Sequence, residues 1–229
     1  MIAVNFNTLP YLQVMVHGVR RYSPADTKIL IVDNSSTDRS LEWIRAQSGL
    51  ELIRLPVNVN HGPAMDIGIY KCRTSHFIAL DIDAFPISNT WISEMLEPLK
   101  SGSRVAGAAI PWGHIQPYVH ACCLAMETAR FVERHHTFCI GPDWDTAQRI
   151  SQREFPAIHT IPPTSSRGPA AVGTVFGGVV YHNFYSARFA ATDRDEIDEG
   201  DPGEDMVVRR NDAESAWGEA VALYFPDMA

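Results

Sequence analysis

The 229-residue sequence lacks several features that would place it in other classes of protein. No apolar run reaches the ~18 residues that a membrane-spanning helix needs, and the N-terminal "MIAVNFNTLP" is too short and too polar for a signal peptide. The four cysteines, Cys72, Cys122, Cys123 and Cys139, form no CxxC pair, so we expect free thiols in a reducing compartment. We therefore expect a cytoplasmic protein with no transmembrane segment.

The chain also lacks any cluster of basic residues. Its net charge is −8 and it has no Lys/Arg-rich run, which excludes the electrostatic footprint of a nucleic-acid-binding protein and a polybasic membrane-binding patch. Neither glycine-rich phosphate loop, GxGxxG or GxxxxGK[ST], follows the first expected strand. A bound diphosphate would therefore need a metal ion, backbone amides or a few well-placed cations to hold it.

Strands and helices are expected to alternate over the first hundred residues. The expected strands are 2–6, 28–34, 50–56 and 76–85, and the expected helices are 12–22, 36–47, 62–73 and 88–100, with Ser36 or Thr37 and Ser88 or Asn89 as N-caps. The strands are continuously apolar, which indicates a parallel sheet covered by helices on both faces. The length and the 45% hydrophobic content suit one such α/β domain with a small appendage.

The pattern after residue 104 is less regular. We expect strands at 105–110 and 172–182 and helices at 144–155 and 213–225, while 119–135 fits either one amphipathic helix or a helix plus a strand. The segment from Thr192 to Asp205 is acidic and contains Pro and Gly, which is typical of a mobile loop or a solvated tail. The C-terminal helix is expected to dock back on the body of the domain.

Polar residues follow three of the expected strands, where open α/β sheets bind their ligands. The first strand ends in Asn5, Phe6, Asn7 and Thr8, the second in Asp33, Asn34, Ser35 and Ser36, and the fourth in Asp81 and Asp83. Asp81 and Asp83 stand at i and i+2, so both carboxylates address one side of an extended strand, and such oxygens suit Mg²⁺ or Mn²⁺. The alternative is that they cap the helix near Ser88. We favour the metal, because two like charges at a sheet end are costly without a counter-ion.

Four segments of the chain carry a family resemblance. "IAVNFNTLPYL", "ILIVDNSSTDRS", "NVNHGPAMDIGI" and "FIALDIDAF", in this order and spacing, resemble the nucleotide-sugar glycosyltransferases of the GT-A fold, specifically glycosyltransferase family 2. The resemblance covers about the first hundred residues well and the rest weakly. It implies an α/β GT-A architecture, in which a Rossmann-like, mostly parallel central sheet is flanked by helices and joined by a smaller acceptor-side region.

The resemblance implies roles for donor-binding residues. Asp33 would contact the base or ribose of the donor, Asp81 would serve the ribose, and Asp83 would be the direct metal ligand. A donor-side segment of the family is matched by Asn58, His61, Gly62, Pro63, Ala64 and Asp66, and Asn7 is a further donor-binding candidate. Asn60 departs from the family pattern, in which a glycine is usual.

A later block, "PDWDTAQR" (142–149), resembles the family's "EDxDLxxR" element, whose second acid is the general base. By position the base would be Asp143, with Asp145 as an accessory acid and Arg149 as their partner, although Pro142 replaces the usual Glu. From the residues alone, Asp145 equally fits an N-cap that has Gln148 as its capping-box partner. Both aspartates therefore remain catalytic candidates.

His182 resembles the late histidine that completes the metal site of many GT-A enzymes, and the alternative is a histidine that is merely hydrogen-bonded at a strand end. Arg188 would contact the diphosphate or be a surface cation. An acceptor-pocket wall is expected around four aromatic or imidazole side chains, which are as plausibly core residues: Trp112, His114, Tyr118 and His120. The run of Arg134 to His136 is expected on a solvated face.

These expectations combine into one functional hypothesis. Residues 1–105 would bind the donor, 106–190 would bind the acceptor and carry catalysis, and 191–229 would form an acidic loop and a C-terminal helix. The enzyme would use Mn²⁺ or Mg²⁺ to transfer a sugar, with inversion, from a nucleoside diphosphate sugar to a hydroxyl-bearing saccharide, lipid-linked or small-molecule acceptor. The alternatives are a nucleotidyltransferase, which would normally carry a Gly-rich loop after the first strand, and a binding module without catalysis.

Overall fold

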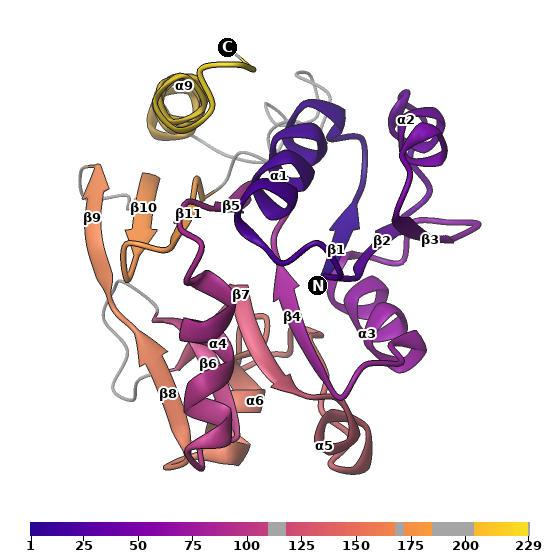
Figure 1. Cartoon of the computed structure of the whole chain (residues 1–229), viewed down its shortest axis with the longest axis vertical. Helices are drawn as coiled ribbons and strands as arrows, with labels where there is room; N and C mark the ends of the chain where they lie inside the picture. Colours follow the sequence, from indigo (N-terminus) through magenta and orange to yellow (C-terminus); the bar gives the residue numbers. More distant parts are fainter. Residues whose placement is uncertain (110–117, 168–171, 185–203, 229) are drawn as a thin grey trace.

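The protein is an α/β domain in which a seven-stranded sheet is joined to a smaller four-stranded sheet (Figure 1). The structure is a computed structural model, and it describes residues 1–109, 118–167, 172–184 and 204–228. Trp112, His114, Arg188 and most of the acidic segment lie outside these residues. Among the described helices, none is both long enough and apolar enough to cross a membrane.

The first hundred residues alternate between strands and helices, as the apolar pattern predicts. The elements are β1 (Ile2–Asn5), α1 (Leu9–Tyr22), β2 (Ile29–Asp33), α2 (Ser40–Ala46), β3 (Leu50–Arg54), α3 (His61–Lys71), β4 (His76–Leu80), β5 (Ala84–Pro86) and α4 (Trp91–Lys100). The expected strand at 76–85 is thus divided into β4 and β5 by a turn that contains both aspartates.

The predicted N-caps of α2 and α4 are wrong. Arg39 and Thr90 precede these helices, and neither makes a side-chain capping bond. At α2, the Ser40 amide donates instead to Oδ1 of Asp38 at 2.9 Å. The cause is that both helices begin later than their sequence pattern suggests, so the predicted hydroxyls lie in the preceding loops.

The second half builds the rest of both sheets. Its elements are β6 (Val105–Ala109), β7 (Val119–Glu127), α5 (Thr128–Glu133), α6 (Gln148–Glu154), β8 (Ile158–Ile161), β9 (Pro163–Arg167), β10 (Val172–Phe176), β11 (Val180–His182) and α9 (Glu204–Tyr224). Of the two alternatives for 119–135, the structure shows the second, with the strand β7 before the helix α5. The expected strand at 172–182 is a hairpin, because Gly177 and Gly178 adopt positive φ angles of 56° and 68° that let the chain reverse.

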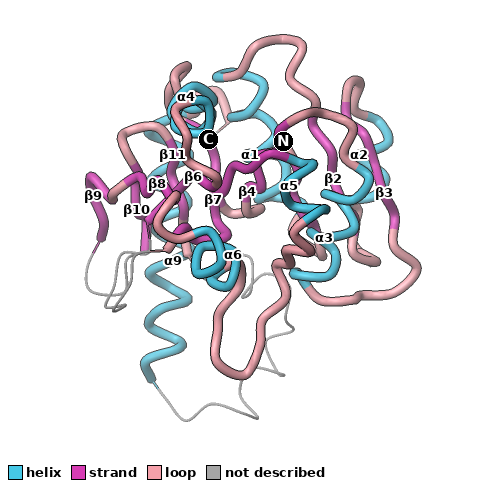
Figure 2. The backbone as a smooth tube through the Cα atoms, turned by 90° about the horizontal axis from the view of Figure 1, so that it is seen from below, coloured by secondary structure: helices cyan, strands magenta, loops and turns pink. Residues whose placement is uncertain are grey.

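The large sheet has the order β3-β2-β1-β4-β7-β6-β8, and only β7 runs antiparallel to its neighbours. Helices cover both faces: in Figure 2 the strands cross the middle of the view, with α4 on one side and α6 on the other. The strand order reverses at β1, which lies between β2 and β4. Ligands of doubly wound sheets bind at this switch point, outside the carboxyl ends of the strands.

The small sheet has the order β5-β11-β10-β9 and is antiparallel throughout. Helix α9 covers it, with the Trp217 ring 4.6 Å from that of Tyr11 and 5.4 Å from that of Phe85, between ring centres. The expected docking of the C-terminal helix is therefore confirmed. β5 directly follows the turn after β4 and is an edge strand of the small sheet. Residues of the small sheet therefore lie next to the switch point of the large sheet.

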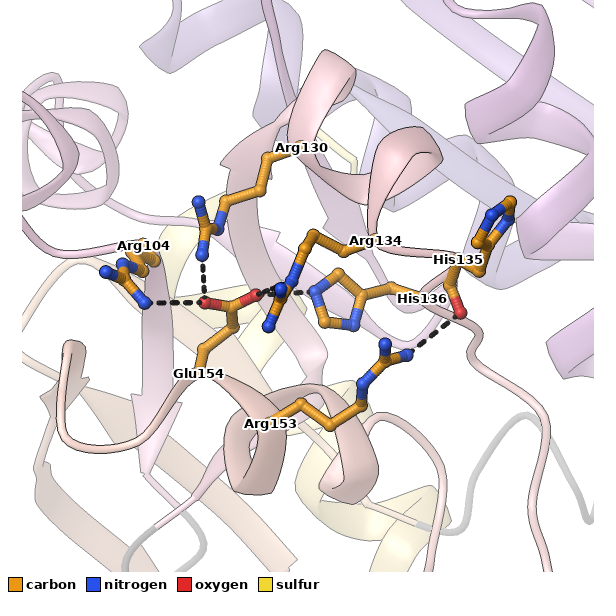
Figure 3. A network of polar contacts seen from close by, with 7 residues as sticks. All are labelled: Arg104, Arg130, Arg134, His135, His136, Arg153 and Glu154. Atoms are coloured by element: carbon orange, nitrogen blue, oxygen red, sulfur yellow. Dashed lines mark hydrogen bonds and ion pairs between the residues drawn. The ribbon is translucent and has the colours of Figure 1, made fainter.

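A buried carboxylate joins α6 to α5 and to the start of β6 (Figure 3). Glu154 is fully buried, and its Oε2 accepts a hydrogen bond from Arg130 Nη2 at 2.6 Å, while Oε1 lies 2.7 Å from Nε2 of His136. Arg104 and Arg134 approach the same carboxylate at 3.6 and 3.8 Å. The expected solvated face at 134–136 is therefore wrong for His136, which is 2% exposed.

Candidate active site

A cleft of about 420 Å³ opens at the switch point of the large sheet. Its lining residues include those that follow β1 and β2, those that lead into α3, and the turn between β4 and β5. Others come from the start of β7, the loop before α6 and the end of β11. Because β7 is antiparallel, its first residues lie at the same edge of the sheet as the carboxyl end of β4. Segments distant in sequence therefore meet in one cleft.

Two carboxylates and a histidine form the centre of the cleft. Nε2 of His182 lies 3.3 Å from Oδ1 of Asp83 and 3.7 Å from Oδ2 of Asp81. Asp83 and His182 are 4% and 3% exposed. The turn is fixed by the Ala84 amide, which donates to the Asp81 carbonyl at 3.1 Å, and the Asn183 amide donates to the Asp83 carbonyl at 3.0 Å.

A second histidine reaches Asp81 from the opposite side, since Nε2 of His61 lies 3.5 Å from Oδ1 of Asp81. Burial raises the pKa of Asp81; His61 and His182 partly oppose this rise, while Asp83 and Asp145 add to it. A cation beside these carboxylates would relieve both the burial and the repulsion. One ligand atom from each of Asp81, Asp83 and His182 lies within 4.8 Å of the others. Carboxylate oxygens with one imidazole suit Mn²⁺ or Mg²⁺, so these residues fit the expected ion.

Two asparagines form the cleft wall beside β1 and β2. Asn34 Nδ2 donates to Oδ1 of Asn58 at 2.8 Å, and Oδ1 of Asn34 accepts from the Val59 amide at 3.0 Å. Both residues line the cleft, and Asn58 stays a donor-binding candidate. Asn34 was noted in sequence only as a strand-end residue. Its side-chain contact with the loop before α3 depends on the folded chain.

Asp33 and Asn7 support the cleft from behind and are not among its lining residues. Asp33 is fully buried: Oδ1 accepts from Asn5 Nδ2 at 3.1 Å, and Oδ2 accepts from the Ser36 amide at 3.2 Å. Oδ1 of Asn7 accepts from the Thr37 amide at 2.7 Å. The structure therefore places both side chains in contacts that hold the loops after β1 and β2.

Gly62 and Asp66 connect α3 to the segment 137–139. A Cβ on Gly62 would lie 2.7 Å from the carbonyl oxygen of Phe138, so only glycine permits this approach. Asp66 accepts from Thr137 Oγ1 at 2.5 Å and from the Phe138 amide at 2.8 Å. Burial raises the pKa of Asp66, and these hydrogen bonds oppose the rise. Neither residue lines the cleft, and both anchor the chain that leads to the predicted catalytic block.

The two catalytic candidates lie on one turn but in different surroundings. Both aspartates are exposed, but Asp145 lines the cleft and Asp143 is not among the lining residues. The Asp145 amide donates to Gln148 Oε1 at 2.8 Å, which is half of the predicted capping box. Ala147 is the residue that precedes α6, so the predicted N-cap role of Asp145 is wrong.

Trp144 holds this turn together. Gly141 and Trp144 form a β-bridge, and a Cβ on Gly141 would lie 2.2 Å from the indole. The Arg149 guanidinium lies 4.5 Å from the centre of the same indole ring. Arg149, which the resemblance places beside the two acids, thus stacks on Trp144.

The acceptor-pocket wall stays a prediction, and two of the residues expected in it are described by the structure. His120 lines the cleft, with its ring centre 5.9 Å from that of His182, but Tyr118 is 2% exposed and belongs to the core. Burial lowers the pKa of His120 to about 3. Sequence analysis missed Phe184, whose ring centre lies 3.9 Å from that of His182. The signal was its place two residues after the expected metal ligand, although the chain is no longer extended there, since Phe184 has a φ of 32°.

Comparison with known proteins supports this assignment of the fold. TarS from S. aureus, solved in complex with UDP-GlcNAc, matches with a TM-score of 0.54 and 13% identity over 69% of this chain. The mannosyltransferase PcManGT from Pyrobaculum calidifontis, solved with GDP-Man and Mn²⁺, matches with a TM-score of 0.57 and 15% identity over 98% of this chain and 80% of its own. At such low identities these matches show the fold alone, and they confirm the predicted GT-A-like architecture.

The chain spans 54% of the TarS chain that it matches, about half of its length. No curated protein matches it in sequence. The family model "Glycosyl transferase family 2" matches residues 1–117. These residues make up more than half of the 229-residue chain and include the turn with both aspartates. The chain therefore belongs to glycosyltransferase family 2.

Proposed function

We propose that the protein is a metal-dependent glycosyltransferase that moves a sugar from a nucleoside diphosphate sugar to a hydroxyl acceptor, with inversion. The observation that carries this proposal is the convergence of Asp81, Asp83, His182 and Asp145 on one cleft at the switch point of the sheet. Family membership supports the reaction class. The donor chemistry is supported by the UDP-GlcNAc and GDP-Man bound to the two proteins that share the fold.

The order of the strands suggests how the donor lies. The nucleoside would occupy the side of the cleft lined by Asn34 and Asn58, which follow β2 and β3. The diphosphate would lie over the turn between β4 and β5, and the sugar towards the first residues of β7. In this arrangement Asp81 faces the ribose or bound water, and Asp83 faces the diphosphate.

Asp83 and His182 would hold the ion, which supplies positive charge for the leaving nucleoside diphosphate. The described cleft lining contains no lysine or arginine that could do this instead. Nε2 of His61 lies 3.5 Å from Oδ1 of Asp81, so a protonated His61 would add positive charge beside that carboxylate. The Mn²⁺ bound to PcManGT supports this choice of ion.

Asp145 is the residue that we propose as the general base. It lines the cleft, where its carboxylate would take the proton of an acceptor hydroxyl as that oxygen attacks the anomeric carbon. Attack opposite the leaving diphosphate gives inversion. Asp143, which the resemblance favours by position, is exposed on the turn and is the alternative base.

A panel of UDP-, GDP- and dTDP-sugars with Mn²⁺ tests the proposal. We expect one donor to be hydrolysed or transferred, and its nucleoside diphosphate at ~100 Kd to stabilise the fold by about 2.7 kcal/mol in a thermal-shift assay. Asp83→Ala should abolish turnover and Mn²⁺ binding, whereas Asp26→Asn, at an exposed site remote from the cleft, should change neither. Binding without turnover would indicate a binding module, and absence of any nucleotide-sugar binding would refute the proposal.

A further inference from the structure

A second group of metal-ligand side chains adjoins the carboxylate centre. His120 and Cys122 stand at i and i+2 on β7, so both project to the same side of the strand. One ligand atom from each of His120, Cys122 and His182 lies within 4.8 Å of the others. Around a tetrahedral zinc ion such atoms lie roughly 3.5 Å apart, as Zn–N and Zn–S distances of about 2.0–2.3 Å require. Small side-chain shifts would therefore close the group around an ion.

The two nitrogens of His182 have different surroundings. Nε2 lies 3.3 Å from Oδ1 of Asp83, while Nδ1 is buried and has no hydrogen-bond partner among the described residues. A buried polar atom without a partner is costly. Metal-bound histidines typically donate their second ring N–H to a carboxylate. An ion on Nδ1, with Nε2–H donating to Asp83, would satisfy both nitrogens.

His120 and Cys122 supply the other two ligands. Nδ1 of His120 accepts a hydrogen bond from the Cys122 amide at 3.1 Å, so this nitrogen carries no proton and has a lone pair for a metal. Binding would exchange that hydrogen bond for a metal–nitrogen bond. Cys122 is fully buried and would bind as the thiolate, releasing its proton to solvent.

We propose that His120, Cys122 and His182 form a second cation site that takes a soft divalent ion such as Zn²⁺. Thiolate and imidazole ligands suit this class of ion, whereas the carboxylates of Asp81 and Asp83 suit Mg²⁺ or Mn²⁺. His182 belongs to both sets. Its neutral ring has only one nitrogen free of a proton, so it serves one ion at a time. Zn²⁺ at the second site therefore weakens Mn²⁺ binding at the first.

Titration of the metal-free protein with Co²⁺ tests this site without any sugar donor. A thiolate ligand gives cobalt a charge-transfer absorption in the near ultraviolet. We expect this absorption to appear at one equivalent of Co²⁺ and to vanish when Zn²⁺ is added. Cys122→Ala should abolish it. Cys123→Ala is the matched control, because the neighbouring thiol is also fully buried but lies 3.6 Å from Met95 Sδ, in α4, and outside the ligand group.

Mn²⁺ binding, followed by electron paramagnetic resonance, tests the competition. The Zn²⁺ concentration that releases half of the Mn²⁺ should be at least tenfold higher in Cys122→Ala than in the unchanged protein. His120→Gln, at a side chain on the cleft wall, should act likewise, and it provides the test if the cysteine variant does not fold. Absence of the cobalt–thiolate absorption, its persistence in Cys122→Ala, or equal Zn²⁺ potency in both variants and the unchanged protein would overturn the proposal. A protein without transferase activity would still give these readouts.

Discussion

Nε2 of His182 lies 3.3 Å from Oδ1 of Asp83 because the small sheet pairs β11 with β5. In this register His182 stands opposite Ala84, the residue that follows Asp83. The contact therefore depends on strand pairing between distant parts of the chain and on the hairpin that precedes His182. A residue outside the region matched by the family model thus completes the carboxylate centre.

The position of Asp145 leads to the first prediction. Asp145→Asn should lower turnover by about 10²–10⁴-fold, the usual contribution of a general base, and leave Mn²⁺ and nucleotide affinity unchanged. Asp143→Asn should retain turnover, because Asp143 does not line the cleft. Steady-state kinetics with the donor identified in the panel measures both variants. A loss confined to Asp143→Asn would make Asp143 the base.

The contact between Gly141 and Trp144 leads to the second prediction. A Cβ on Gly141 would lie 2.2 Å from the indole, so Gly141→Ala must open the turn that presents Asp145. Displacement of a catalytic group by about 1 Å costs roughly 10²-fold in rate. We therefore expect a loss of that size in kcat, with Mn²⁺ affinity unchanged because the ligands lie on other elements.

Gly218→Ala is the matched control for this variant. Gly218 lies in α9, and an added Cβ would meet no atom within 4 Å. Because alanine is the better helix former, this change should stabilise the protein by up to ~1 kcal/mol and leave the rate unchanged. Full activity in Gly141→Ala would show that the turn does not position the base.

Local sequence patterns predicted the elements of the fold well, because short apolar runs bounded by polar residues determine buried strands. They also identified Asp81 and Asp83, because side chains at i and i+2 project to the same side of an extended chain. The pairing of His182 with these aspartates could be expected only through the family resemblance. Nothing in the spacing of residues along the chain indicates which strands of a second sheet will pair.

The errors arose where a side chain's partner lies far away in sequence. The donor-side role of Asp66 stays a prediction, but the hydrogen bonds that Asp66 accepts from residues 137 and 138 depend on tertiary packing and could not be predicted from the sequence. His136 was expected on a solvated face because the run from Arg134 to His136 has no carboxylate or cysteine at metal-ligand spacing, yet it is buried against Glu154. Between Asp143 and Asp145, the shape of one turn determines which carboxylate enters the cleft, and the residue pattern fits both.

The backbone at Asn60 leads to the third prediction. Its φ of 69° and ψ of 168° lie in a region that is essentially restricted to glycine and costs other residues about 1–3 kcal/mol. The loop thus keeps the conformation suited to the glycine that is usual in the family. Asn60→Gly should relieve this strain and raise the Tm of the ligand-free protein by about 2–4 °C per kcal/mol gained.

Asn89→Gly is the control for Asn60→Gly, because Asn89 is exposed and is not among the residues with positive φ. There the added backbone freedom should lower stability by about 0.5–1 kcal/mol. Differential scanning calorimetry of the two variants compares the effects directly. A lower Tm in both variants would refute the strain at Asn60.

The buried Glu154 leads to the last prediction. Burial alone would raise its pKa, but Arg130 and His136 outweigh burial and hold the pKa below its ordinary value of 4.5. The ionised carboxylate thus contributes stability that is present above pH ~4.5 and is lost as the pH falls through the lowered pKa. Glu154→Gln should cost about 3–5 kcal/mol at pH 7, because it leaves the Arg130 guanidinium without its counter-charge. Urea unfolding at pH 7 and below pH 4 should show this difference shrinking at the lower pH, and a constant difference would contradict the charged network.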